Sequence, residues 1–444
     1  MTLPLLPPLR LDPAMPRFAA PDFPGARWIG SLDVSSLGRP VIVLSEADGY
    51  SLARFLIRDG ATVLGFVNVE APHGTVDMQA LRREVASLPV AASQTIERTH
   101  PSVTVVICTR DRPQHLRTVL RSVLDLDYPE FTVLVVDNAP ATRASHDLVR
   151  DEFADPRVSY RLEAIAGTSR ARNTGLICAT GQIVAYVDDD VVVDRLWLRE
   201  LMAGFDLESN IGCVTGLVPS GELRTRVQRC FDERVSWAKN LELKLYRLSD
   251  PPKNLPMFPF CIGDYGTGAN FALRRSTALE IGGFDTALGG GVPTYGGEDI
   301  DVFVRTLLHG AALVVQPAAV AWHRHRDEIS ALSKQARGYG TGLGAWATKL
   351  MLNRRSAGMV LTRAPQALVR LIANARPARA ESERDETVDS DELARVLARI
   401  GWLELLCVAT GPLRYAKLRR AGYGQLGKEA LERTRSSTRM VQES

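Results

Sequence analysis

The sequence lacks the features that mark several large classes of protein. Its six cysteines never form a Cys-x-x-Cys pair, which argues against a zinc ribbon and against a disulfide framework. The formal net charge is only +3 over 444 residues, so the composition gives no reason to expect a nucleic-acid partner. No apolar run approaches the roughly 18 residues of a membrane span, and the Pro-rich N-terminus does not resemble a signal peptide. We therefore expect a cytoplasmic protein.

Changes in composition divide the chain into four regions. Residues 1–40 are rich in Pro and Arg and are expected to be irregular, whereas 41–98 show the strand and helix pattern of a small α+β unit. Residues 101–330 alternate between apolar strands and helical segments, which predicts an α/β domain with a doubly wound, mostly parallel sheet. Residues 331–444 are basic and amphipathic, and we expect helices there, with the acidic run at 381–392 as a solvated linker.

The most informative motif is a run of carboxylates at the end of a predicted strand. Residues 183–187 are apolar, and Asp188, Asp189 and Asp190 follow them directly. Ligands of such sheets bind beyond the carboxyl ends of the strands. Three adjacent carboxylates repel one another unless a cation compensates them, and Mg²⁺ or Mn²⁺ bound to a substrate diphosphate would do so. A solvated turn is the alternative, and the triplet alone leaves both interpretations open.

Two other predicted strands end in polar residues at the same edge. Thr109 and Arg110 follow the strand at 103–108, in a turn whose backbone amides can face an anion or a base edge. Asp137 follows the strand at 131–136, where a carboxylate can accept from a base N–H or a ribose hydroxyl. An ordinary strand-to-helix loop and a turn aspartate are the alternatives, and these short signals do not decide between them.

A predicted helix at 169–179 adds two cationic side chains. Arg170 and Arg172 have the forked guanidinium that neutralises a diphosphate, although most arginines on such a helix are surface residues. Asn173 and Gly175 are poor residues for a helix interior, which indicates close packing or the approach of a ligand.

Further along the chain, a glycine-rich loop at 288–297 precedes a helix that starts with two acidic residues. Glu298 and Asp299 stand at that helix start, where a carboxylate is well placed to act as a general base. Capping of the helix by Asp299 is the alternative. His323 follows a late strand and can complete a metal shell with Asp190, although a structural histidine is an equal expectation.

In this order the motifs resemble those of the family 2 glycosyltransferases, which have the GT-A fold. The motifs are Thr-Arg-Asp-Arg-Pro, a strand ending in Asp, Ala-Arg-Asn-x-Gly, Asp-Asp-Asp, Gly-Gly-Phe-Asp and Gly-Glu-Asp. The resemblance covers roughly residues 101–330. It implies inverting transfer of a sugar from a nucleotide-diphosphate donor to a hydroxyl acceptor, with Mn²⁺ or Mg²⁺ as the cofactor.

The resemblance and the residues together define a set of expected roles. Asp299, with Glu298 beside it, is expected to take the proton of the acceptor. The expected metal ligands are Asp188, Asp190 and His323. The expected donor-binding residues are Thr109, Arg110, Asp137, Arg170, Arg172, Asn173, Asp188 and Asp189.

The chain also departs from part of the family pattern. It lacks the Gln-x-x-Arg-Trp motif of processive polysaccharide synthases, which favours single additions to a polysaccharide, glycolipid or other glycoconjugate of the cell envelope. Residues 340–350 and 393–420 mix Trp, Leu and basic residues, which predicts either packing against the catalytic domain or peripheral contact with the inner face of the membrane, near a lipid-linked acceptor. A sugar nucleotidyltransferase and a non-catalytic glycan or nucleotide-sugar binding module are the alternative functions.

Overall fold

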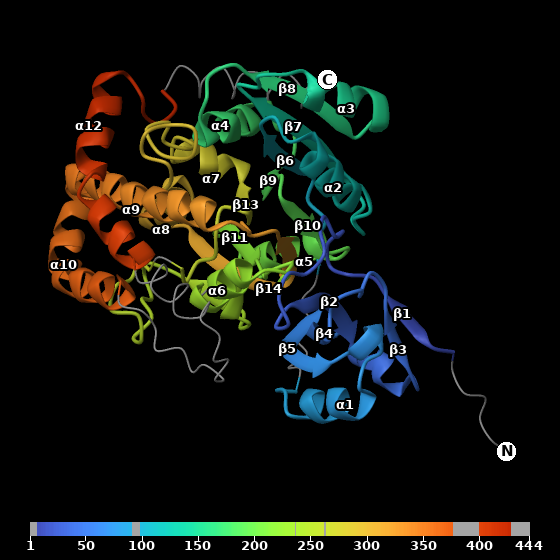
Figure 1. Ribbon diagram of the computed structural model, residues 1–444. Helices are drawn as coiled ribbons and strands as arrows, with labels where there is room; N and C mark the ends of the chain where they lie inside the picture. The colour runs from blue at the N-terminus through green and yellow to red at the C-terminus, as the bar shows by residue number, and fades with distance from the viewer. Residues whose placement is uncertain (1–6, 91–97, 236, 262, 376–398, 428–444) are drawn as a thin grey trace.

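The computed structural model describes residues 7–90, 98–235, 237–261, 263–375 and 399–427. The acidic run at 381–392 lies outside these residues, as do the two ends of the chain. In Figure 1 the N-terminal unit (blue) lies at the lower right, below the central sheet, and the C-terminal helices (orange and red) lie at the left.

A nine-stranded mixed sheet forms the centre, with the strand order β10-β14-β11-β13-β9-β6-β7-β8 and with β12 beside β14. The pairings make β6, β7, β8, β9, β11 and β14 parallel to one another, whereas β10, β12 and β13 run in the opposite direction. This topology confirms the predicted α/β class with a mostly parallel, doubly wound sheet. The strands are β6 (Val103–Thr109), β7 (Phe131–Asn138), β8 (Val158–Glu163), β9 (Ile183–Asp188), β10 (Val191–Val193), β11 (Ile211–Leu217), β12 (Lys244–Tyr246), β13 (Asn270–Arg274) and β14 (Ala312–His323).

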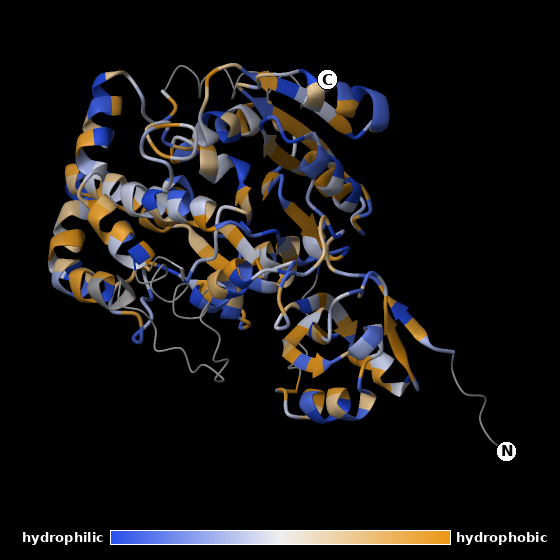
Figure 2. Cartoon of the chain, in the orientation of Figure 1, coloured by the Kyte–Doolittle hydropathy of each residue, from blue (hydrophilic) through white to orange (hydrophobic). Residues whose placement is uncertain are grey.

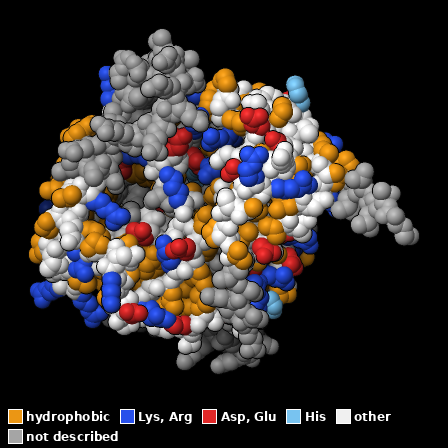
Figure 3. All heavy atoms as spheres, turned by 90° about the horizontal axis from the view of Figure 1, so that it is seen from below, with side chains coloured by type: hydrophobic (Ala, Val, Ile, Leu, Met, Phe, Trp, Pro, Cys, Tyr) orange, Lys and Arg blue, Asp and Glu red, His pale blue; other side chains and the backbone are white. Residues whose placement is uncertain are grey.

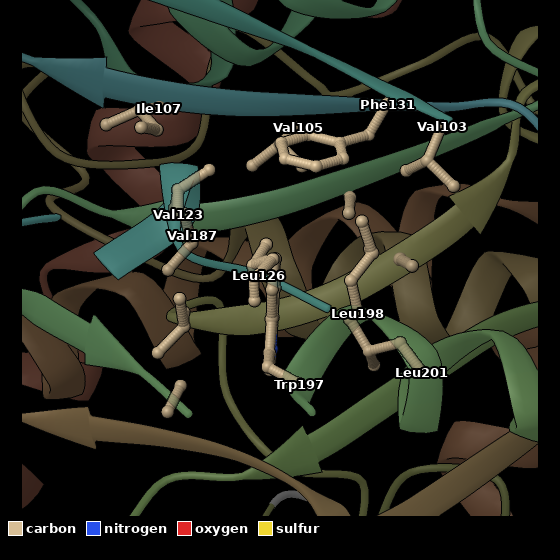
Figure 4. Packing of buried hydrophobic residues seen from close by; sticks show 14 of the residues in the cluster. Val103, Val105, Ile107, Val123, Leu126, Phe131, Val187, Trp197, Leu198 and Leu201 are labelled. Carbon is tan, nitrogen blue, oxygen red and sulfur yellow. The ribbon is translucent and has the colours of Figure 1, made fainter. Parts of the chain in front are cut away.

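Helices cover both faces of this sheet because successive side chains of each strand point to opposite sides. Val105 of β6 belongs to one buried cluster and Val106 to the other. Figure 4 shows the first cluster, where Trp197 and Leu201 of α5 pack under the strands. Hydrophobic residues concentrate in the central strands (Figure 2). The helices of this domain are α2 (Pro113–Leu124), α3 (Ala144–Glu152), α4 (Thr168–Cys178), α5 (Trp197–Phe205), α6 (Arg226–Arg234), η3 (Trp237–Lys239), α7 (Arg275–Glu280) and α8 (Glu298–His309).

The N-terminal unit begins earlier than predicted, and residues 1–40 are not uniformly irregular. Its elements are β1 (Leu9–Leu11), β2 (Arg27–Asp33), η1 (Val34–Gly38), β3 (Ile42–Leu44), β4 (Leu52–Asp59), β5 (Thr62–Glu70), η2 (Pro72–Gly74) and α1 (Met78–Ala86). β2 pairs in parallel with β4 along its whole length, and Trp28 and Leu32 are buried. The prediction was wrong because β2 takes its register from a strand that follows later in the chain, which no local pattern reveals.

The N-terminal unit is fastened to the catalytic domain by apolar and charged contacts. Met15 shares a buried cluster with Leu217 and Trp322. At the same boundary, the guanidinium of Arg54 lies 2.6 Å from a carboxylate oxygen of Asp232. This unit is therefore packed beside the end of β14.

The described part of the C-terminal region is helical, as expected. It contains α9 (Ile329–Leu352), α10 (Arg354–Ala375), a helical segment at 399–408 and α12 (Gly411–Arg420). A Cβ atom on Gly344 of α9 would lie 2.0 Å from the carbonyl oxygen of Val408, so this helix pair requires glycine. Within the described ranges, no helix is both long and apolar enough to cross a membrane.

Candidate active site

The ends of β6, β7 and β9 lie side by side and bring three predicted motifs together. Thr109 is the register partner of Asp137, and Cys108 is the partner of Asp188. The hydroxyl of Thr109 donates a hydrogen bond of 2.8 Å to a carboxylate oxygen of Asp189. The sheet therefore gathers the polar strand ends at one edge, as the sequence predicts.

Arg112 is a site residue that the sequence reasoning missed. Its guanidinium lies 2.9 Å from Asp189 and 3.2 Å from Asp190. Burial and the neighbouring Asp190 raise the pKa of Asp189 to about 6, and the bonds from Arg112 and Thr109 offset part of that rise. The second arginine of Thr-Arg-Asp-Arg-Pro was the signal that could have identified it.

Asp190 and His323 meet although 133 positions separate them in the chain. Strand β10 is antiparallel to β14 and pairs Val191 with His323, which places the imidazole Nε2 atom 3.1 Å from Asp190 Oδ1. Burial alone would raise the pKa of Asp190, but His323 and Arg112 outweigh it and hold this pKa well below its ordinary value. Burial opposes the charged imidazole, yet Asp190 raises the pKa of His323.

The predicted set of three metal ligands does not form a closed protein shell. Asp188 Oδ1 lies 3.3 Å from the guanidinium of Arg172, whereas Asp190 Oδ1 lies 3.1 Å from the imidazole of His323. Among the residues that the structure describes, no group of three or more His, Cys, Asp or Glu side chains could hold a metal ion. Asp190 and His323 instead fit a cation that completes its shell with substrate phosphates, as Mg²⁺ and Mn²⁺ sites often do.

The buried guanidinium of Arg172 joins the strand end to the predicted base. Its Nη1 atom lies 3.1 Å from a carboxylate oxygen of Glu298, and Nη2 donates a bond of 2.8 Å to the carbonyl of Gly268. The side chain is only 4% exposed, and its terminal nitrogens face protein acceptors. The expectation that Arg172 contacts the diphosphate is therefore wrong, because the guanidinium is committed to the protein.

Asp299 is the more accessible of the two acidic residues at the start of α8. Glu298 is buried, whereas Asp299 is half-buried and accepts a hydrogen bond of 2.8 Å from the backbone N–H of Gly268. A Cβ atom on Gly268 would lie 3.0 Å from the Cβ of Asp299, so only glycine leaves room for this contact. Gly297 occupies the N-cap position in the left-handed region, which rules out Asp299 as the cap.

Asn173 does not have the predicted donor-binding role. Its amide nitrogen donates to the carbonyl of Phe284, and its amide oxygen accepts from the N–H of Phe284, both at 2.8 Å. The side chain is buried and fixes the Gly-Gly-Phe-Asp segment. Close packing, the alternative interpretation of this residue, is what the structure shows.

Asp137, Arg110 and Arg170 are also predicted donor-binding residues, and they differ in their surroundings and exposure to solvent. Asp137 is fully buried, its Oδ2 atom accepts from the hydroxyl of Tyr160 at 3.0 Å, and its Oδ1 atom has no partner. Burial raises the pKa of Asp137. The side chain of Arg110 is 51% exposed, and the guanidinium of Arg170 lies 4.8 Å from the ring of Tyr423. The donor-binding roles of these three residues stay predictions.

A lysine of α9 fixes the glycine-rich loop and helix α8 to each other. Lys349 Nζ lies 2.9 Å from Asp285, before the loop, and 2.8 Å from Asp301, in the first turn of α8. Tyr415 of α12 donates to Asp285 as well, at 3.0 Å. Both carboxylates are almost fully buried. Sequence reasoning missed Lys349 and Tyr415 because no local pattern links them to a loop that lies far earlier in the chain.

Part of the chain is similar in sequence to known glycosyltransferases. Residues 104–278 match the model of glycosyl transferase family 2. The chain is 28% identical over 230 residues to the pre-mycofactocin glycosyltransferase of Mycobacterium tuberculosis, covering 52% of this chain and 44% of that protein. It is 27% identical over 193 residues to the glucosyl-dolichyl phosphate glucuronosyltransferase of Haloferax volcanii, covering 42% and 57%. The chain thus spans about half the length of these relatives.

A solved structure with partial likeness is that of a mannosyltransferase from Pyrobaculum calidifontis in complex with GDP-Man and Mn²⁺. It is 20% identical, covers 72% of this chain and 90% of its own, and gives a TM-score of 0.46. The family match at 104–278 includes Arg112, Arg172 and the carboxylates at 188–190, whereas Glu298, Asp299 and His323 lie beyond it.

Replacement of Lys349 by Met should loosen the loop that leads to Glu298 and Asp299. The change leaves the buried carboxylates of Asp285 and Asp301 without their shared cation, which should cost about 3–5 kcal/mol of stability. Hydrogen exchange should accelerate in residues 285–301 more than in β6 and β9. Lys334 lies on the same helix and is exposed, so Lys334→Met is the control. Equal hydrogen exchange in the two variants would contradict the role of Lys349 in fixing the loop.

Replacement of Glu298 by Gln should change how stability depends on pH. Burial raises the pKa of Glu298 from 4.5 to about 7, and Arg172 offsets only part of the rise. The folded protein therefore binds more protons between these values, so its stability falls as the pH rises through that window. Urea unfolding at pH 4.5 and 8 should show Glu298→Gln gaining up to about 3 kcal/mol relative to the parent. If the free energy of unfolding changed equally between pH 4.5 and 8 in the parent and in Glu298→Gln, the raised pKa of Glu298 would be contradicted.

Proposed function

We propose that the chain is an inverting glycosyltransferase that moves a sugar from a nucleotide-diphosphate donor to a hydroxyl acceptor. The observation that carries this proposal is the chain of contacts from the strand end to the start of α8. Asp188 contacts Arg172, Arg172 contacts the Gly268 carbonyl, and the Gly268 N–H contacts Asp299. These contacts hold Asp188 and Asp299 in one arrangement, which supports the proposal that they serve the same reaction.

In the proposed reaction Asp299 acts as the general base. The acceptor oxygen forms a bond to the anomeric carbon while the bond from that carbon to the diphosphate oxygen breaks. The acceptor proton passes to the carboxylate of Asp299, and the nucleoside diphosphate leaves with the bonding electron pair. Attack on the face opposite the leaving group inverts the configuration, so no covalent enzyme intermediate is required.

Asp190 and His323 are the residues that would hold a divalent cation. When bound, Mn²⁺ or Mg²⁺ stabilises the negative charge that develops on the leaving diphosphate. Arg112 lies 3.2 Å from Asp190 and adds a fixed positive charge at the same edge. Asp137, at the end of the adjacent strand β7, is buried and its Oδ1 atom has no partner, and in this proposal a bound nucleoside supplies the missing donor.

Two alternatives receive less support. A sugar nucleotidyltransferase usually grips its triphosphate with a glycine-rich loop and a lysine after the first strand, whereas β6 is followed here by Thr-Arg-Asp-Arg-Pro. A non-catalytic binding module has no need for a half-buried carboxylate fixed by two backbone N–H groups, as Asp299 is by Gly268 and Ile300.

Single substitutions should separate binding from catalysis. With Mn²⁺ and a panel of UDP- and GDP-sugars, Asp299→Asn should keep nucleotide affinity but lose about 10²–10⁴-fold in turnover, because the base is lost. Asp190→Asn should weaken the Mn²⁺-dependent part of nucleotide binding. Asp151→Asn, on the exposed surface of α3, is the matched control. Turnover at the parent's rate in Asp299→Asn, or none in the parent with any donor, would overturn the proposal.

We further propose that the C-terminal region touches the inner face of a membrane, where a lipid-linked acceptor would be presented. On α10, Leu361, Leu368 and Val369 are exposed, at 60%, 57% and 69%, and the same helix carries the exposed basic residues Arg355 and Arg370. Hydrophobic and basic side chains lie next to one another along the left of Figure 3, the side where Figure 1 places α10. Apolar groups flanked by arginines suit an anionic bilayer.

Vesicle flotation tests the membrane contact. The parent should float with vesicles that contain phosphatidylserine and should float less with pure phosphatidylcholine. Leu361→Ser combined with Leu368→Ser should reduce flotation about tenfold, because the apolar contact is removed. Leu162→Ser, an exposed leucine on β8, is the control. Flotation that is equal for the parent and the double variant would refute the contact through α10.

A further inference from the structure

Helix α9 touches the turn that precedes the proposed base. A Cβ atom on Gly342 would lie 2.7 Å from the backbone carbon of Gly296, and a Cβ atom on Gly297 would lie 3.0 Å from the carbonyl oxygen of Gly342. A side chain at position 342 would collide with the backbone of Gly296, and Gly297 has a φ of +90°, so both positions favour glycine. The backbone of α9 therefore supports the segment that delivers Glu298 and Asp299 into the site.

Two exposed tyrosines stand beside this crossing. Tyr295 lies at the end of the glycine-rich loop and is 54% exposed, and Tyr339 lies on α9 and is 42% exposed. Gly338, which precedes Tyr339 in the chain, lies against Tyr295, because a Cβ atom on Gly338 would lie 3.3 Å from the Cβ of Tyr295. The hydroxyl of Tyr339 accepts a hydrogen bond of 2.8 Å from the amide of Gln335.

The position of Tyr295 is held against an unfavourable backbone conformation. Its φ angle is +62°, which is rare for an aromatic residue. Its N–H donates to the carbonyl of Val292 at 3.0 Å, and the guanidinium of Arg414 in α12 lies 5.5 Å from the ring centroid. Strain of this kind persists where the surroundings fix it, and it is common at ligand clamps.

The negative charge of Asp299 affects the pKa of Tyr339. The pKa of this phenol is raised, first because protein surrounds its hydroxyl and second because the carboxylate of Asp299 is near. Tyr339 nevertheless remains partly exposed to solvent. An aromatic surface of this kind adjoins the group that would accept the acceptor's proton.

We propose that Tyr295 and Tyr339 form one wall of the acceptor subsite and pack against the ring of an acceptor sugar. A pyranose presents apolar C–H faces and a rim of hydroxyls, which suits an aromatic ring beside polar groups such as Gln335 and Asp299. This inference rests on the proposed glycosyl transfer. Tyr339 lies outside residues 104–278, so acceptor choice would depend on a part of the chain that the family match does not include.

Saturation-transfer NMR with methyl glucoside, galactoside and mannoside tests this wall, in the presence of UDP or GDP and of Mg²⁺, which is diamagnetic and does not broaden the glycoside signals. The parent should transfer saturation to at least one glycoside. Tyr295→Leu and Tyr339→Leu should each weaken that binding about tenfold, because the aromatic face is lost. Tyr339→Phe should restore most of the affinity, because the ring remains. Thermal unfolding checks that each variant is folded.

The outcomes distinguish this inference from the proposed function. A parent that hydrolyses a donor but binds none of the glycosides keeps the proposed function and overturns the acceptor wall. The acceptor wall is also overturned if the Leu variants bind a glycoside as well as the parent does. A parent that neither hydrolyses nor binds any nucleotide sugar overturns the proposed function itself.

Discussion

The buried guanidinium of Arg172 is the interaction on which the site depends. A charge enclosed by protein is tolerated only when acceptors surround it, and here Asp188, Glu298 and the carbonyl of Gly268 do so at 2.8–3.3 Å. These acceptors come from three segments that are far apart in the chain. The end of β9, the approach to β13 and the start of α8 are therefore held in one arrangement, and Asp299 is fixed next to them.

The regions outside the sheet complete this arrangement. The glycine-rich loop bends closely enough to reach α9, and Lys349 ties both ends of the loop through Asp285 and Asp301. The N-terminal unit contacts the other side of the site, where the guanidinium of Arg324 lies 3.6 Å from the ring of Phe18. Both regions contribute to the structure of the site, because each packs against a segment that carries a proposed catalytic or metal-binding residue.

Much of the fold and part of the site followed from the sequence. Alternating apolar strands and helices predicted the sheet, and the rule that ligands bind at strand ends identified the edge where Thr109, Asp137 and Asp190 meet. The errors share one cause. The roles of Arg172 and Asn173 depend on Glu298 and Phe284, more than 100 positions away, and the strand at 27–33 depends on β4. Contacts made by folding leave no periodic signal in the local sequence.

The most direct test of the account is a crystal structure of the chain with Mn²⁺ and a nucleoside diphosphate. The account predicts a cation bonded to Asp190 and His323 and to the diphosphate, a nucleoside beside Asp137, and Arg172 still between Asp188 and Glu298. A nucleotide bound elsewhere, or a cation held without Asp190, would contradict it.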